Sequence, residues 1–71
     1  MQREPVSSDA LHRVGCDPKR RWLEIEFTSG AVYRYFDVPK SLHIDLMQAE
    51  SHGHFYAEHI GDAGFDYVRL A

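Results

Sequence analysis

The stretch "WLEIEFTSGAVYRYFDVP", residues 22–39, decides the fold of this 71-residue chain. It opens with strict alternation, in which Leu23, Ile25 and Phe27 lie on one side of the backbone and two glutamates on the other. This period of two is typical of an antiparallel strand with one buried face. A Ser-Gly pair and a second alternating run follow, so the stretch predicts a β-hairpin.

The length of the hairpin loop determines which residues pair. A two-residue Ser-Gly turn would place Arg34 opposite Ile25 and bury its charge, whereas a three-residue loop that ends on a left-handed Gly30 places Tyr33 there. We therefore expect the longer loop, with Tyr33 and Tyr35 pointing into the core and Arg34 and Phe36 pointing outward. The expected pairs are Phe27 with Ala31, Ile25 with Tyr33, Leu23 with Tyr35, Glu24 with Arg34 and Trp22 with Phe36.

Another strand is predicted upstream, over residues 10–16, before a four-residue loop at 17–20 that opens with Asp-Pro. This loop would pair Val14 with Leu23, His12 with Ile25, Arg13 with Glu24 and Gly15 with Trp22. Residues 1–8 are polar and contain a proline, so we expect a partly ordered N-terminal segment there and a single domain over residues 9–71.

The C-terminal half predicts helices and a closing strand. Pro39 suits the first turn of a helix that continues with Leu42, Leu46 and Ala49 at helical spacing. Ser51 can cap a second, shorter helix that ends at Gly61, with Phe55, Tyr56, His59 and Ile60 as its apolar side. Residues 65–70 alternate again as a strand. The expected fold is α+β, with a small antiparallel sheet of three N-terminal strands and one C-terminal strand packed against one or two helices.

The composition predicts a globular domain: 44% of the residues are hydrophobic, 27% are charged, and no apolar run is long enough to span a bilayer. Cys16 is the only cysteine, so an intrachain disulfide is impossible, and we expect a cytoplasmic protein. The net charge is −3, with the basic residues concentrated in the first half. Contact with nucleic acid must therefore be local.

Catalytic and metal chemistry find little support in the sequence. His52 and His54 lie two residues apart, on different faces of a helix, so with His59 and Glu58 they do not form a convergent metal site. Cys16 shares the core side of its strand, and we expect a buried, unreactive thiol rather than a nucleophile. We expect no enzyme activity, no catalytic residue, no bound metal and no cofactor.

The outer face of the predicted sheet is the candidate binding surface. Aromatic side chains beside arginines on a sheet are how several RNA-binding domains stack bases. The same patch could bind a protein partner or a second copy of the chain, or simply cover the sheet. The candidate residues are Arg13, Arg20, Arg21, Trp22, Arg34 and Phe36.

Three segments, "SSDALHRVGCD", "LEIEFTSGAVYRYFDVP" and "AESHGHFYAEHI", resemble in order and spacing the KTSC domain, a small family found at the C-terminus of some lysyl-tRNA synthetases and as a stand-alone bacterial protein. The matching motif residues are Tyr33, Tyr35, Val38, Pro39, Ala49, Ser51, Gly53 and Phe55, whose roles we expect to be mainly structural. The resemblance implies little about activity, and the attachment of the family's domain to a synthetase suggests binding of RNA, either tRNA or a single strand. Cys16 and Ala57 depart from the family pattern, which usually has tyrosine and asparagine there.

Overall fold

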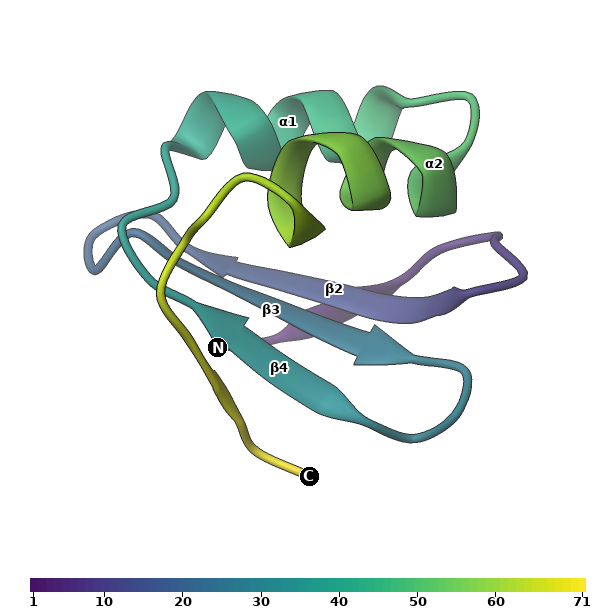
Figure 1. Ribbon diagram of the computed structural model, residues 1–71, viewed down its shortest axis with the longest axis horizontal. Coiled ribbons are helices and arrows are strands. Elements are labelled where there is room, and N and C mark those ends of the chain that lie inside the picture. The colour runs from purple at the N-terminus through teal and green to yellow at the C-terminus, as the bar shows by residue number, and fades with distance from the viewer.

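A five-stranded antiparallel sheet forms one layer of the protein, and two helices cover one of its faces (Figure 1). The computed structural model describes residues 1–71. The strands β1 (Arg3–Pro5), β2 (Leu11–Asp17), β3 (Trp22–Phe27), β4 (Val32–Tyr35) and β5 (Tyr67–Arg69) lie side by side in chain order. Helix α1 (Lys40–Gln48) is followed by α2 (His52–Tyr56), which continues as a π-helical segment, η1 (Ala57–Gly61). The α+β prediction is confirmed, with four strands rather than three before the helices.

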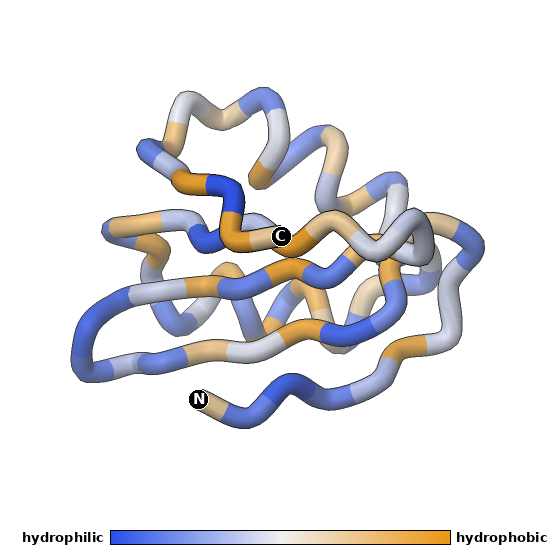
Figure 2. Tube along the Cα trace, turned by 90° about the horizontal axis from the view of Figure 1, so that it is seen from below, coloured by the Kyte–Doolittle hydropathy of each residue, from blue (hydrophilic) through white to orange (hydrophobic).

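The core lies between the sheet and the helices. Leu23 and Ile25 from β3 meet Leu46 from α1 and Ile60 from η1, and all four are fully or almost fully buried. These are the apolar residues of the two periodic patterns, and each contributes about 1.5–3 kcal/mol by leaving water. The strands alternate hydrophobic and hydrophilic residues along their length (Figure 2), so one sheet face packs on the helices and the other faces outward.

The expected register of the β3–β4 hairpin is confirmed. Leu23 pairs with Tyr35, Glu24 with Arg34 and Ile25 with Tyr33. Phe27 N–H donates to the Ala31 carbonyl at 2.8 Å, and Gly30 has a φ of 95°. The loop therefore spans three residues and ends on a left-handed glycine, a conformation that costs glycine little because it has no Cβ.

The expected register between β2 and β3 is wrong by two residues. Val14 pairs with Ile25, not Leu23, and Gly15 pairs with Glu24, not Trp22. Asp17 remains in the ladder opposite Trp22 and accepts the Arg20 N–H at 3.3 Å through its carboxylate. Because aspartate occupies the position before the turn, the loop begins one residue later than expected.

A β-bulge at the start of β2 corrects a second expectation. Leu11 pairs with Phe27 and Arg13 with Glu26, so His12 between them has no partner. The extra residue reverses the alternation, which exposes His12 and leaves Leu11 at 1% exposure. Burying leucine instead of histidine avoids desolvating a polar ring, and His12 is therefore not a core residue opposite Ile25.

Strand β1 lies within residues 1–8, where the sequence predicts no strand, and pairs with β2 through Arg3 and Gly15.

In the second helix, Ser51 caps as expected, since its Oγ accepts the His54 N–H at 3.2 Å. His59 is exposed rather than part of the buried side. No helix in the chain is long and apolar enough to cross a bilayer.

Candidate functional site

The centre of the outer sheet face is an ion-pair network around Glu24, whose side chain is only 7% exposed. Arg34 lies opposite Glu24 on β4 and donates from Nε and Nη2 to Oε2 at 2.9 and 2.6 Å. Arg3 approaches the other carboxylate oxygen at 3.8 Å. Arg3 and Arg13 both pair with Glu26, at 3.7 and 3.3 Å. The network thus links β1, β2, β3 and β4 and largely compensates its own charge.

Trp22 lies at one end of this network, where β3 begins. The Arg34 guanidinium carbon is 4.3 Å from the Trp22 ring centroid and that of Arg20 is 5.0 Å away. Phe36 meets the same ring edge-on, with centroids 5.9 Å apart. Guanidinium groups bind over an indole face because the ring quadrupole attracts cations. These contacts hold an aromatic pair and two arginines together on the outer face.

The β2–β3 turn adds free positive charge beside Trp22. Residues 18–21 are exposed and include Lys19, Arg20 and Arg21 in succession. Arg20 pairs with Asp17 at 3.4 Å, but no carboxylate lies within 4 Å of Lys19 or Arg21. An exposed pair such as Arg20–Asp17 is weak and can be exchanged for another anion. The turn therefore carries cations that remain available.

Five of the six predicted outer-face residues come together at this end of the sheet, and one does not. Arg13 pairs with Glu26, several residues along the strands from the Asp17–Trp22 pair. Lys19 was not among the predicted residues, although it stands directly before the arginines. We call the cluster formed by the turn and its neighbours the basic–aromatic patch: Lys19, Arg20, Arg21, Trp22, Arg34 and Phe36.

The two motif tyrosines lie on the inner face instead. Tyr35 is 3% exposed and its phenol forms a hydrogen bond with the phenol of Tyr56, which ties the sheet to α2. Burial first, and then this hydrogen bond, raise the pKa of Tyr35 well above its usual range. Tyr33 stacks on Tyr67 with centroids 5.5 Å apart and meets Phe27 edge-on. Both tyrosines therefore pack within the domain.

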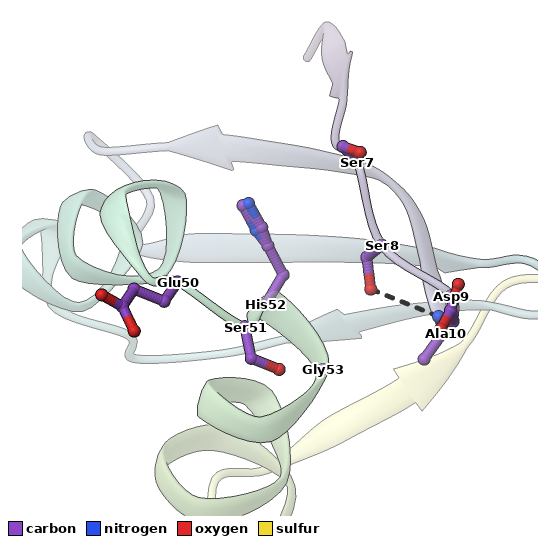
Figure 3. Close-up of a pocket in the computed structure, with 8 residues that line it drawn as sticks. All are labelled: Ser7, Ser8, Asp9, Ala10, Glu50, Ser51, His52 and Gly53. Atoms are coloured by element: carbon purple, nitrogen blue, oxygen red, sulfur yellow. Dashed lines mark hydrogen bonds between the residues drawn. The ribbon is translucent and has the colours of Figure 1, made fainter.

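The other motif residues have local contacts. Pro39 directly precedes α1, and Phe55 packs at the edge of the core and against the His59 ring, with centroids 4.5 Å apart. Ser51 and Gly53 line a pocket of about 400 Å³ between residues 50–53 and residues 7–10 (Figure 3). A Cβ on Gly53 would lie 3.5 Å from the Ala10 Cβ, so the two segments approach closely.

The pocket is polar, and sequence reasoning missed it because its two walls come from segments that lie far apart in the sequence. Ser8 Oγ accepts the Ala10 and Leu11 N–H groups at 3.2 and 3.3 Å. The acidic residues that line the pocket are Asp9 and Glu50, and no lysine or arginine lines it. Two carboxylates without a cation repel phosphate, so the pocket and the basic–aromatic patch differ in the ligands that they favour.

The remaining candidates for chemistry lie apart from both places. His54 and His59 approach the Glu58 carboxylate at 2.9 and 3.7 Å on the exposed side of the second helix. Cys16 packs against the core but is only partly buried. Burial and then the neighbouring Asp17 raise the pKa of its thiol, which lowers the thiolate fraction at neutral pH.

Comparison with known proteins relates the whole chain to bacterial relatives. A protein from Tsukamurella paurometabola is 44% identical over 52 residues, which cover 73% of this chain and 78% of the relative. An uncharacterized protein from Stutzerimonas stutzeri is 36% identical over 70 residues, with 99% of both chains covered.

A crystal structure shows the same fold. It is that of a KTSC domain protein from Yersinia pestis, which is 37% identical, has a TM-score of 0.93 and covers 99% of this chain and 97% of its own. The model of the KTSC domain matches residues 7–65, from the paired serines through both helices to Phe65. The chain belongs to the KTSC domain family.

Proposed function

We propose that this protein is a small, non-enzymatic RNA-binding module that contacts unpaired nucleotides through the basic–aromatic patch. The observation that carries the proposal is the position of the Lys19–Arg21 turn directly beside the Trp22–Phe36 pair. Sequence-tolerant binding of single strands combines cations that contact phosphates with planar groups on which bases stack. The patch offers both on one exposed end of the sheet.

The distribution of charge favours the patch over other surfaces. The ion pairs of Glu24 and Glu26 occupy the central arginines, whereas Lys19 and Arg21 are unpaired. The pocket is lined by acidic rather than basic residues. A phosphate backbone is therefore attracted more to the turn than to the central ion pairs or the pocket.

The same features predict weak binding. Trp22 already has Arg20 and Arg34 over its ring, so a base must stack beside the indole on Phe36, or on an arginine plane. Stacking contributes about 1–3 kcal/mol per base, and the overall charge of −3 opposes a polyanion. We expect a dissociation constant of roughly 10 µM or weaker, with a shallow salt dependence set by about two phosphate contacts.

The test is an NMR titration of amide shifts with a single-stranded RNA oligonucleotide and with tRNA, at low and physiological salt. We expect shifts centred on residues 19–22 and 36. Because Arg21 has a φ of 59°, the informative variant is Arg21→Asn, since asparagine tolerates the left-handed conformation. Combined with Lys19→Gln, it should weaken binding about tenfold and reduce the salt slope by about two.

Arg13→Gln is the matched control, because Arg13 lies on the same sheet face but outside the patch. It should change affinity less than about twofold. The proposal is wrong if RNA leaves the patch amides unchanged, or if Arg13→Gln weakens binding as much as the turn variants. Self-association through this surface would appear instead as patch shifts on dilution that RNA does not reproduce.

A further inference from the structure

We propose that the open edge of β5 binds β5 of a second copy of this chain, which joins two sheets into one continuous antiparallel sheet about a two-fold axis. This surface borders the basic–aromatic patch, since Val68 lies opposite Arg34, but it is formed by the free edge of β5 and does not require RNA. Strand β5 is the last in the sheet order, so one of its sides has no partner strand.

Backbone hydrogen bonding determines which groups lie on the free side. The Asp66 carbonyl accepts the Phe36 N–H at 2.9 Å, and the Leu70 N–H donates to Val32 at 2.7 Å. In an antiparallel ladder every second residue bonds to a given neighbour. The N–H and C=O groups of Tyr67 and Arg69 therefore point away from β4, toward the open edge.

These groups are self-complementary in one register. A two-fold axis through Val68 places Tyr67 of each copy opposite Arg69 of the other. The backbone N–H and C=O groups of each such pair can then bond to one another, and the symmetry produces the pair twice. Each arginine then lies beside a tyrosine ring, an arrangement already seen within the chain, where Arg69 is 5.9 Å from the Tyr33 centroid. Centring on Arg69 instead would oppose two like charges.

Exposed apolar side chains support the same contact. Tyr67, Val68 and Leu70 are 57%, 44% and 47% exposed, and they account for three of the five large exposed hydrophobic residues in the protein. In the register centred on Val68, the two valines meet as the closely spaced, non-hydrogen-bonded pair. Dimerisation would thus bury apolar surface as well as pair the backbone.

The opposite edge of the sheet explains why the second copy binds through β5 and not through β1. The two strands form the opposite edges of the sheet. Strand β1 contains Arg3, Glu4 and Pro5, and charged residues and proline are features that block pairing of edge strands. Strand β5 has no proline or acidic residue. Head-to-tail β1–β5 assembly is therefore disfavoured, and the closed dimer remains.

Short strands limit the strength of the dimer. Only three residues of each chain belong to β5, so the interface is below the size of permanent dimers, and we expect a dissociation constant of roughly 0.1–1 mM. Sedimentation equilibrium of the 71-residue chain between about 20 µM and 2 mM tests this. A weight-average mass that rises toward that of the dimer is expected, and a monomer throughout the range would overturn the proposal.

Val68→Lys identifies the surface. It places two ammonium groups against each other at the axis and should weaken dimerisation at least about tenfold, while the fold tolerates it because Val68 is 44% exposed. Ile44→Lys is the matched control, since Ile44 is 43% exposed on α1. Equal effects of the two variants, or none from Val68→Lys, would contradict an edge contact through β5.

A disulfide tests the register. Val68→Cys in a Cys16→Ser background should form a disulfide-linked dimer on mild oxidation, because residues directly opposite in a non-hydrogen-bonded pair bring their Cβ atoms to about 4.5–5.5 Å. Asp62→Cys in the same background is an exposed control that should remain unlinked. Linking of both at the same rate, or of neither, would refute the Val68-centred pairing. An RNA titration at about 20 µM protein, where a dimer this weak is mostly dissociated, separates failure of this proposal from failure of the proposed function.

Discussion

Glu24 stabilises the sheet by pairing with arginines of neighbouring strands, and it is not available to a ligand. Its position in an alternating strand predicts an outward side chain, and the structure places it outward but buried beneath Arg34 and Arg3. A buried carboxylate is tolerated only when charge-assisted hydrogen bonds replace its lost hydration. Arg34 provides them and is thereby less free to bind phosphate than the arginines of the turn.

We predict that Glu24→Ala lowers the free energy of unfolding by about 2–3 kcal/mol, because it leaves the Arg34 guanidinium without its partner. Glu26→Ala, whose side chain is 20% exposed and whose ion pairs are longer, should cost about 0–1 kcal/mol. Urea denaturation of both variants measures the difference. Equal costs would mean that Glu24 acts only through surface charge.

At the scale of elements, the two loops of the three-stranded meander differ in how firmly the sequence determines them. The β3–β4 loop needs a residue with positive φ at a single place, and Gly30 supplies it. The β2–β3 turn instead has Arg21 at a φ of 59°, which residue preferences do not predict. The Asp17 carboxylate and a hydrogen bond from Val38 N–H to the Arg21 carbonyl at 2.9 Å hold that conformation.

We predict that Gly30→Ala destabilises the protein by about 1 kcal/mol, since a Cβ at a φ of 95° strains the loop although nothing lies within 4 Å of it. Gly53→Ala is the contrasting control. Gly53 lies in a helix, and a Cβ there would make ordinary contacts at 3.5 and 3.8 Å, so stability should rise by a few tenths of a kcal/mol up to about 1. Thermal unfolding measures whether each variant is less or more stable than the natural protein. Destabilisation by Gly53→Ala together with no effect of Gly30→Ala would contradict both expectations.

At the scale of the whole molecule, the helix layer docks on the sheet through the core and through polar side chains at its edges. His43 of α1 is partly buried, and its imidazole feels the charge of Glu4 on β1. Burial lowers the pKa of His43, and the Glu4 carboxylate opposes that shift only in part. The protonation of one helix residue is thus coupled to global stability.

We predict that stability falls as the pH drops below about 6.5, the usual pKa of histidine, because the unfolded chain then binds a proton that the folded chain resists. The loss levels off once the pH passes below the lower folded-state pKa. Urea unfolding between pH 7.5 and 5.5 should show the decline in the natural protein and in His12→Gln, whose imidazole is exposed, and a smaller decline in His43→Gln. An unchanged slope in His43→Gln would exclude His43 as the cause.

The sequence by itself determined the fold class, the β3–β4 register, the Ser51 cap and the inward direction of Tyr33 and Tyr35. Each depends on neighbouring residues or on a short loop, where periodicity and turn chemistry suffice. It also brought Trp22, Arg34 and Phe36 onto one face, because they share the outer side of two paired strands, and it placed Arg20 and Arg21 in the turn directly before Trp22.

Only the tertiary structure decided the features that join distant segments. The bulge at His12 reverses the face of Leu11, and the Asp17 turn shifts β2 by two residues, because core packing and side-chain hydrogen bonds outweigh strand preferences there. Strand β1 has no periodic pattern of its own and exists through its pairing with β2. The pocket and the open β5 edge likewise arise where the two ends of the chain meet its middle, and contacts at such separation leave no local pattern in the sequence.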